Sequence, residues 1–365
     1  MFNVSALYLA AKKNNVEIIN LLLSDTNIEI GPNTFNGCTR ITEIFIPSQL
    51  TEIKEGTFER CTSLAKIKIP ESITKILERC FRDCTSLTEI TIPSSVDFIG
   101  QLAFEKCSSL VKFEIPNLVQ TIENGTFNEC TSLTEIKIPS TVTHINESAF
   151  KNCSSLAQID LPPCLTKISK CVFCECSSLM QILIPQSVTL IDSYAFQKCT
   201  KLTQISLPHS LKSINDYSFN SCSSLIKISL PKTVTNIGDY AFAGCSALEE
   251  IDIPESVNNI GQHAFSVCSS LKKFDVPPLV SVIQARTFYG CTSMAHITIL
   301  ASVTKIENEA FRNCSSIKEI SIPLSVTEIG NLAFAGCTSL KKLKIPTTLN
   351  LSNAGIDANV KLIEA

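Results

Sequence analysis

Cysteine is the residue whose type and spacing first suggest chemistry in this chain of 365 residues. Fourteen of the 18 cysteines recur at one fixed period, which runs through Cys38, Cys61 and Cys84 and ends at Cys337. Such a column could form disulfides between neighbouring copies, hold a metal ion, or place small buried thiols beside backbone carbonyls. The geometry that a fixed period imposes decides between these three chemistries.

Each period of the sequence is expected to form one coil of a stack, with equivalent side chains in register. In-register Cβ atoms one coil apart are parallel and about 4.8 Å apart, whereas a disulfide prefers about 3.8 Å. A metal site needs thiolates that converge on one point, and a straight column does not converge. We therefore expect a structural column of reduced, buried thiols, each able to donate weakly to a nearby carbonyl.

One repeat carries extra cysteines. Its letters "CVFCEC" contain a CxxC spacing, formed by Cys171 and Cys174. Cys176 belongs to the column and should point inward, while Cys171 and Cys174 should lie on a turn. Cys164 should lie on the far side of the coil. No second CxxC and no histidine is nearby, so surface or half-buried thiols are expected, and a zinc or redox site is the alternative.

The other residues that could act in catalysis are scattered. The four histidines stand in different repeats and at different positions, so we expect exposed polar side chains at His144, His209, His263 and His296. The sequence has no Gly-rich phosphate loop, no GxSxG and no HExxH. We therefore expect no enzyme, with no catalytic residue, no cofactor and no metal.

The cysteine column is part of a wider repeat that must position these residues. Phe recurs at the same period, from Phe35 to Phe334, and Cys follows three residues later in every copy. Ile, Leu or Met stands six residues after Phe, and apolar residues stand nine and eleven after. Pro follows in every copy but one, where Leu300 replaces it. A period without insertions or deletions is the signature of a repeat architecture.

The letters "LTEIKIPSTVTHINESAFKNC" show how one coil would form. The first part alternates apolar and polar residues, so Ile136 would point inward from a strand while Glu135 and Lys137 point outward. Pro139 lacks an N–H and ends the strand. The letters "STVTHI" predict a second short strand, and "NESAFKNC" predicts a turn with one or two helical turns. One coil cannot bury its apolar face alone, so stacked coils must share a continuous core.

The segment from Cys130 to Phe150 resembles the 23-residue leucine-rich repeat of the BspA-like surface-antigen family. The likeness runs from about Gly31 to Leu349. It implies a solenoid with a parallel β-sheet on its concave face, and a role in adhesion by binding host or extracellular-matrix proteins. It supplies no catalytic residue. The expected fold class is a repeat solenoid of leucine-rich-repeat type with a short helical N-terminal cap.

The two ends depart from the repeat. Residues 5–24 resemble one ankyrin repeat with two short helices, and we expect residues 1–30 to cap the first open coil. The alternative is the remnant of a longer ankyrin array that binds a partner. Residues 31–350 would form a solenoid of fourteen repeats. Ser352 stands where the repeat has Ile, so residues 351–365 are expected to cap the last coil.

The composition argues against several classes of partner. The chain is 44% hydrophobic and 18% charged with a formal net charge of −3, which gives no reason to expect nucleic acid. It has no run of about 18 apolar residues, so no membrane insertion is expected. The first residues lack the basic start and apolar core of a secretory signal, which favours a cytoplasmic location. The family resemblance favours the cell surface instead, and a monomer is expected.

The outward positions of the first strand in each coil would form the concave face, where repeat proteins usually bind. Charges alternate along its N-terminal half, a quieter stretch follows from Gln158 to Ser229, and acidic residues then return. The alternative is a solvated strand surface that binds nothing. The candidate protein-binding residues on this face are Phe45, Lys66, Lys68, Leu183, Glu250 and Asp252.

Together these patterns predict a non-enzymatic protein-interaction module whose partner is a protein ligand. By family resemblance it would be a surface adhesin. The alternative is an intracellular scaffold or adaptor, which the absent signal and the ankyrin-like start favour.

Overall fold

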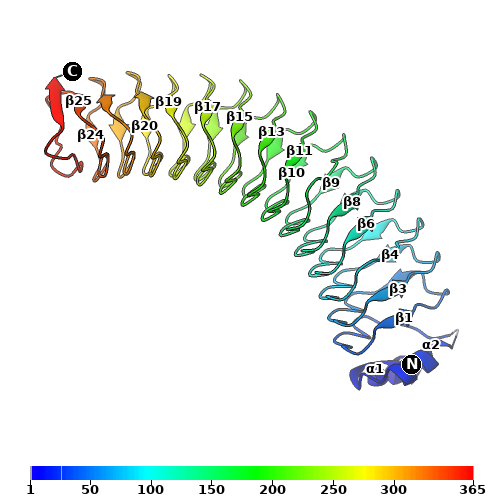
Figure 1. Ribbon diagram of the computed structural model, residues 1–365. Helices are drawn as coiled ribbons and strands as arrows, with labels where there is room; N and C mark the ends of the chain where they lie inside the picture. Colours follow the sequence, from blue (N-terminus) through cyan, green and yellow to red (C-terminus); the bar gives the residue numbers. More distant parts are fainter. Residues whose placement is uncertain (1, 26, 365) are drawn as a thin grey trace. The chain divides into compact units, whose positions relative to one another are not determined.

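The computed structural model describes residues 2–25 and 27–364, which form two short helices followed by stacked coils (Figure 1). The chain divides into two compact units, residues 1–185 and 186–365. The boundary falls inside the repeat, so both units are built from the same kind of coil.

The first unit begins with the helices α1 (Phe2–Lys12) and α2 (Val16–Leu23). Asn15 caps the start of α2, because its side-chain oxygen accepts a hydrogen bond from the backbone N–H of Ile18 at 3.2 Å. The predicted pair of short helices is therefore present.

Helix α1 makes a specific contact with the first coil. The thiol of Cys38 donates to the backbone carbonyl of Ala11 at 3.1 Å, and both residues are buried. In later coils the equivalent thiol donates to a carbonyl of the coil before it, so α1 occupies the place of a preceding coil. This contact supports the proposal that the helices cap the stack.

Each coil of the first unit carries up to two short strands, which form two rows. In the first row the middle residue is buried and its neighbours are exposed, and this row contains β1 (Glu43–Phe45), β3 (Lys66–Lys68), β6 (Lys112–Glu114), β8 (Glu135–Lys137) and β11 (Gln181–Leu183). The second row contains two-residue strands, β2 (Glu52–Ile53), β4 (Lys75–Ile76), β5 (Phe98–Ile99), β7 (Thr121–Ile122), β9 (His144–Ile145) and β10 (Lys167–Ile168).

The second unit repeats these two rows. Its first row contains β13 (Gln204–Ser206), β15 (Lys227–Ser229), β17 (Glu250–Asp252), β19 (Lys273–Asp275), β21 (His296–Thr298), β23 (Glu319–Ser321), β25 (Lys342–Ile345) and β26 (Lys361–Glu364). Its second row contains β12 (Leu190–Ile191), β14 (Ser213–Ile214), β16 (Asn236–Ile237), β18 (Asn259–Ile260), β20 (Val282–Ile283), β22 (Lys305–Ile306) and β24 (Glu328–Ile329).

Strands of successive coils pair in parallel with a register of one repeat. In the first unit β6 pairs with β8 and β7 pairs with β9, so that Ile122 lies opposite Ile145. In the second unit β15 pairs with both β13 and β17. The predicted strand, the predicted second strand and the predicted fold class, a parallel-strand solenoid, are confirmed.

The prediction of helical turns around Phe was wrong. Among the described residues only α1 and α2 are α-helices, and the segment around Phe127 is a series of turns. Gly125 and Glu129 both have left-handed backbones, with φ of 60° and 61°, which a right-handed helix cannot contain. The N–H of Phe127 donates to the carbonyl of Ala149 in the next coil at 2.9 Å, so hydrogen bonds between coils replace those of a helix.

The repeated Phe and Cys residues form the core of each unit. Consecutive Phe rings lie 5.3–5.9 Å apart and within 9° of parallel. The carbonyl of Phe127 accepts the N–H of Cys130 at 3.1 Å and the thiol of Cys153 at 3.2 Å. The predicted buried column of thiols that donate to carbonyls is confirmed.

The C-terminal tail leaves the fixed period but continues the stack. β26 pairs in parallel with β25, and Lys342 lies opposite Lys361, so the last step along the chain is shorter than a full repeat. The N–H of Phe334 donates to the carbonyl of Ala354 at 2.9 Å, as in a complete coil. The tail is thus a shortened coil, and its role as a cap stays a proposal.

We expect Phe150→Ala to lower stability by about 3–5 kcal/mol, because the ring is fully buried and its loss leaves a cavity between two stacked neighbours. Urea denaturation followed by circular dichroism measures the change. Lys137→Ala, at an exposed position in the same coil, is the control and should change stability by less than about 0.5 kcal/mol. Equal denaturation midpoints for the two variants would contradict this account of the core.

Candidate protein-binding face

In each unit, the exposed residues at the two ends of the first-row strands form a surface, here called the strand face of that unit. Phe45 on β1 is 63% exposed and lies opposite Lys68 of β3, while Leu183 on β11 is 77% exposed. In the second unit both end residues of β17 are exposed. The alternation of apolar and polar residues in the sequence therefore correctly predicted that all the candidate residues lie on the strand faces. These residues are Phe45, Lys66, Lys68, Leu183, Glu250 and Asp252.

Two adjoining hollows lie around Lys68 in the first unit. One, of about 650 Å³, is bordered by Phe45 and Leu23 and by the end of α2. The other, of about 460 Å³, is bordered by Lys66 and by Glu89 of the following coil. Lys68 and Glu43 line both hollows, so the three N-terminal candidates are brought together at one place.

A third hollow extends the first two along the strand face. It has a volume of about 340 Å³, and it shares Glu89 and Thr91 with the hollow beside Lys66. Its far side is bordered by Glu135 and Lys137 of β8. Three adjoining hollows therefore follow one another along the strand face of the first unit, from α2 to β8.

Ion pairs join neighbouring coils beside the third hollow, between β6 and β8. Lys112 Nζ lies 2.7 Å from Glu135 Oε2, and Lys137 Nζ lies 3.7 Å from Glu114 Oε2. The hydrogen bond from Lys112, helped by its positive charge, lowers the pKa of Glu135. These pairs are exposed, so each is worth little stability, and they partly neutralise the charges of the four side chains.

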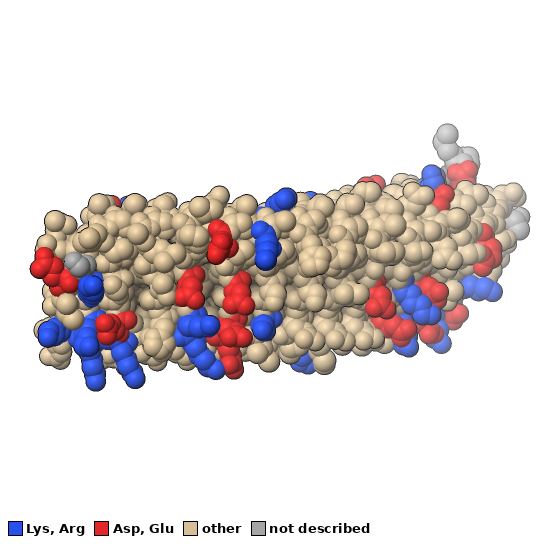
Figure 2. Space-filling model, turned by 90° about the horizontal axis from the view of Figure 1, so that it is seen from above, with Lys and Arg blue, Asp and Glu red and all other residues tan. Residues whose placement is uncertain are grey.

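The lysines of β3 differ from those of β6 and β8. Neither Lys66 nor Lys68 forms an ion pair within residues 2–25 and 27–364, although Glu43 lies opposite Lys66. On the face that is seen from above in Figure 2, the Lys, Arg, Asp and Glu side chains lie in groups with uncharged surface between them. Both lysines are exposed at the ends of β3.

The remaining candidates do not join this arrangement. Leu183 lines none of the three hollows described above. In the second unit Glu250 Oε1 lies 3.6 Å from Lys227 Nζ, while Asp252 lies opposite Ser229. Glu250 is therefore partly neutralised, and Asp252 presents its carboxylate opposite a neutral side chain.

Sequence reasoning missed the residues that complete the hollow beside Phe45. Asn20, Leu23 and Ser24 at the end of α2 form one side of it, and residues 47–49 form another. No sequence signal predicts this contact, because α2 lies outside the repeat and its direction against the first coil follows from packing.

The cysteine column offers no reactive thiol among the described residues. Burial raises the pKa of Cys176 and Cys222 to about 12, and it raises the pKa of Cys130 well above the ordinary value. A thiol with such a pKa stays protonated at neutral pH and is a poor nucleophile and metal ligand. The column therefore acts through packing and hydrogen bonding.

The extra cysteines lie in different environments. Cys164 is exposed and Cys171 is half-buried, as predicted, but Cys174 is only 3% exposed, so the prediction of a surface or half-buried thiol was wrong there. The equivalent position is also buried where it holds Ala243 or Ser266, which shows that a small side chain there is covered by its surroundings.

His263 corrects the prediction that all four histidines are exposed. It is half-buried and stacks on Tyr240 with ring centroids 4.3 Å apart, at the end of a ladder that includes Tyr217 and Tyr194. Burial lowers its pKa, so it is neutral at physiological pH. The ladder arises because one turn position is aromatic in four successive coils.

The described residues contain no group of three or more His, Cys, Asp or Glu side chains arranged to hold a metal ion. In the same part of the chain, neither helix has the length and apolar character needed to cross a lipid bilayer.

The family profile described as "BspA type Leucine rich repeat region (6 copies)" matches residues 11–133, 97–222, 189–318 and 235–359. The overlapping matches cover nearly the whole chain. A comparison with curated proteins found no match. Nothing in these comparisons supports the ankyrin-like assignment of residues 5–24.

Solved structures of bacterial proteins are similar to this chain. A leucine-rich repeat protein from Bacteroides ovatus is 28% identical over 92% of this chain and 86% of its own, with a TM-score of 0.70. One from Eubacterium ventriosum is 26% identical over 87% of each chain, with a TM-score of 0.60. A leucine-rich cell surface protein from Faecalibacterium prausnitzii is 27% identical over 83% of this chain and 78% of its own, with a TM-score of 0.52.

The exposed ion pair predicts a pH effect of known sign. Because the pKa of Glu135 is lowered in the folded chain, its pairing with Lys112 stabilises the fold above the ordinary carboxyl pKa. That small contribution is lost as the pH falls through the lowered value. Lys112→Ala should return the pKa of Glu135 toward its ordinary value in a carboxyl NMR titration, whereas Lys66→Ala should not. An unchanged pKa in Lys112→Ala would contradict the pairing.

Proposed function

Because this chain belongs to the family of proteins with BspA-type leucine-rich repeat regions, we propose that it is a non-enzymatic scaffold that binds a protein ligand through its strand face. Proteins built from leucine-rich repeats are typically protein-interaction modules. The observation that carries the proposal is the row of three adjoining hollows from α2 to β8, which are lined by exposed side chains that differ from coil to coil.

The chemistry of these hollows suits a protein surface. Phe45 and Leu23 provide apolar area, and Lys66 and Lys68 provide cations without ion-pair partners among the described residues. Glu43 adds a carboxylate opposite Lys66. Protein interfaces place aromatic and apolar side chains in a central pocket and polar groups around it. We place the centre of the interface at Phe45 and its basic rim at β3.

A role as a surface adhesin is the more specific form of this proposal. It is supported by the similarity to the Faecalibacterium prausnitzii protein, which is a leucine-rich cell surface protein. We further propose that α1 and α2 serve as a cap, since α1 supplies the carbonyl that accepts the first column thiol. An intracellular scaffold would use the same strand face with a different partner.

Binding to the proposed centre can be tested with a basement-membrane protein preparation fixed on a surface. We expect Phe45→Ala combined with Lys68→Glu to reduce capture of the full chain by about tenfold or more, because central interface residues each contribute about 2 kcal/mol or more. The control exchanges the charges of an ion pair on the strand face of the second unit, through Glu319→Lys with Lys342→Glu. Equal loss of capture in both variants would contradict a specific centre at Phe45.

The location of the chain can be tested separately. Protease treatment of intact source cells should remove the protein if it is an adhesin, and a cytoplasmic enzyme in the same cells serves as the control for leakage. Full protection in unbroken cells would overturn the adhesin role while leaving the protein-binding proposal to the capture experiment.

A further inference from the structure

The turn that contains Cys171 and Cys174 has a geometry suited to a disulfide. The N–H of Cys174 donates to the carbonyl of Cys171 at 3.1 Å. A hydrogen bond from residue i+3 to residue i closes a β-turn, whose end Cα atoms lie within about 7 Å. Disulfides join Cα atoms about 4.4–6.8 Å apart. The backbone therefore already holds the two cysteines at bonding range.

The two thiols are in contact but differ in access. Cys171 is half-buried, Cys174 is buried, and their side chains share a hydrogen bond. This bond lowers the pKa of Cys171 to about 7 and raises the pKa of Cys174. Cys171, the thiol that solvent can reach, is therefore the one of the pair that ionises first.

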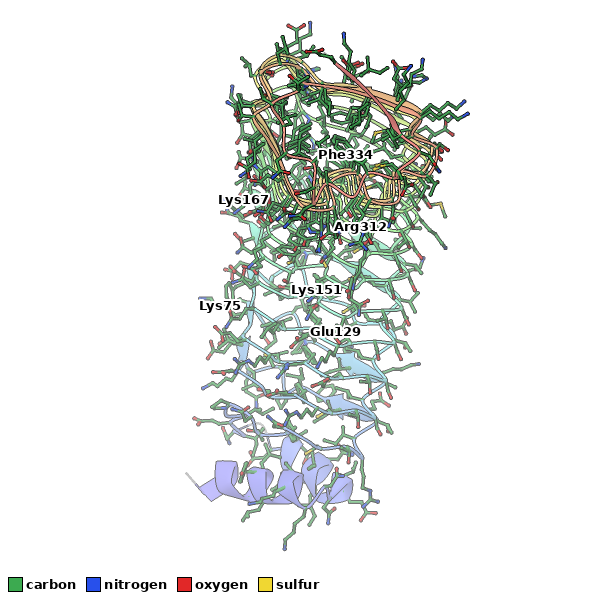
Figure 3. The ribbon with its side chains drawn as sticks, turned by 90° about the vertical axis from the view of Figure 1, so that its left-hand side faces the viewer. Lys75, Glu129, Lys151, Lys167, Arg312 and Phe334 are labelled. Carbon is green, nitrogen blue, oxygen red and sulfur yellow. The ribbon has the colours of Figure 1, made fainter. Side chains whose placement is uncertain are left out.

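The neighbouring charges favour a thiolate at Cys171. Lys151 stands at the position equivalent to Cys174 in the preceding coil, and Figure 3 shows it on the turn side of the first unit. The charges of Lys151 and Lys170 favour the thiolate, while that of Glu147 opposes it. Glu147 is held by Lys170, with Oε1 at 3.3 Å from Nζ, which weakens its effect.

We propose that Cys171 and Cys174 are a redox-active pair that forms a reversible disulfide by exchange with low-molecular-weight disulfides such as oxidised glutathione. Cys171 is the attacking thiol and Cys174 is the resolving thiol. This chemistry is independent of the strand face and of any protein ligand.

The exchange balances in two steps. The Cys171 thiolate attacks one sulfur of the small disulfide, which forms a mixed disulfide and releases one small thiolate. Cys174 then loses its proton and attacks the Cys171 sulfur, which closes the Cys171–Cys174 bond and releases the second small thiolate. The protein loses two electrons and two protons, and the small disulfide is reduced to two thiols.

Formation of the mixed disulfide at Cys171 makes Cys174 easier to deprotonate. The negative charge of Cys171 is one cause of the raised pKa of Cys174. That charge disappears when Cys171 enters the mixed disulfide, so Cys174 gives up its proton more readily. The sulfur it must attack is the one with which it already shares a hydrogen bond.

The other cysteines cannot take part in this way. Cys153 and Cys176 of the column are fully buried, and their thiols donate to the carbonyls of Phe127 and Phe150. Cys164 is exposed but has no cysteine three residues away in the sequence. It therefore serves as an internal control for a thiol that is accessible but is not part of a CxxC pair. Exposure alone favours reaction at Cys164, whereas the thiol pair favours Cys171.

The test treats the reduced full chain with oxidised glutathione at pH 7 and maps the products by mass spectrometry. We expect a loss of two hydrogens located to the peptide that contains Cys171 and Cys174, with slower addition of glutathione at Cys164. Cys174→Ala should instead keep glutathione on Cys171. Modification at Cys164 alone, or a stable mixed disulfide at Cys171 in the unchanged chain, would overturn the proposal.

The variants are chosen so that the coil keeps its fold. Ala243 already occupies the position equivalent to Cys174, and Ser148 occupies that of Cys171 with the same left-handed backbone. Cys171→Ser and Cys174→Ala should therefore give the circular dichroism spectrum of the unchanged chain.

A pH profile separates a reactive pair from simple exposure. In a Cys164→Ser chain, the alkylation rate of Cys171 by iodoacetamide should rise with a midpoint near pH 7, since the thiolate is the nucleophile. Adding Cys174→Ala should move that midpoint upward, because the hydrogen bond that stabilises the thiolate is removed. Identical profiles for the two chains would contradict the role of Cys174.

Discussion

Beyond the first coil, column thiols such as those of Cys61 and Cys153 donate a hydrogen bond to the phenylalanine carbonyl of the coil before, and this contact constrains the length of each coil. In the first unit it measures 3.1 Å at Cys61 and 3.2 Å at Cys153. The same carbonyl also accepts the N–H of the cysteine in its own coil. Because one donor lies in the same coil and the other in the next, a coil that gained or lost one residue would forfeit the second bond. The uninterrupted period of the sequence reflects that constraint.

The buried core residues and the strands could be predicted from the sequence. Alternation identified the buried Ile136, and the Phe and Cys spacings identified the core. The turns could not be predicted, because Tyr217 and Arg286 adopt left-handed backbones that their residue types do not suggest. Hydrogen bonds to the next coil, such as that from Tyr217 N–H to the Asp239 carbonyl at 2.9 Å, compensate for the strained conformation.

The candidate site could be predicted only in part, for a related reason. A pattern within one coil shows that Phe45 and Lys68 are exposed, but not that a hollow opens between them. That hollow depends on where α2 ends against the first coil. The CxxC spacing was visible in the sequence, whereas the burial of Cys174 beside a half-buried Cys171 depends on the turn.

The division between core and surface explains where chemistry can arise on this scaffold. A column residue such as Cys176 contacts the coil before it through its thiol, so a replacement there disturbs the stack. The position directly after Phe holds Lys151 in one coil and Cys174 in the next, and the backbone bond from Asn152 N–H to the Cys174 carbonyl at 2.7 Å joins the two coils regardless of either side chain. The backbone bond between these coils therefore does not depend on the residue type at this position, unlike the thiol–carbonyl bond of the column. Function can change at these positions, and on the strand face, as long as the thiol–carbonyl contact is left intact.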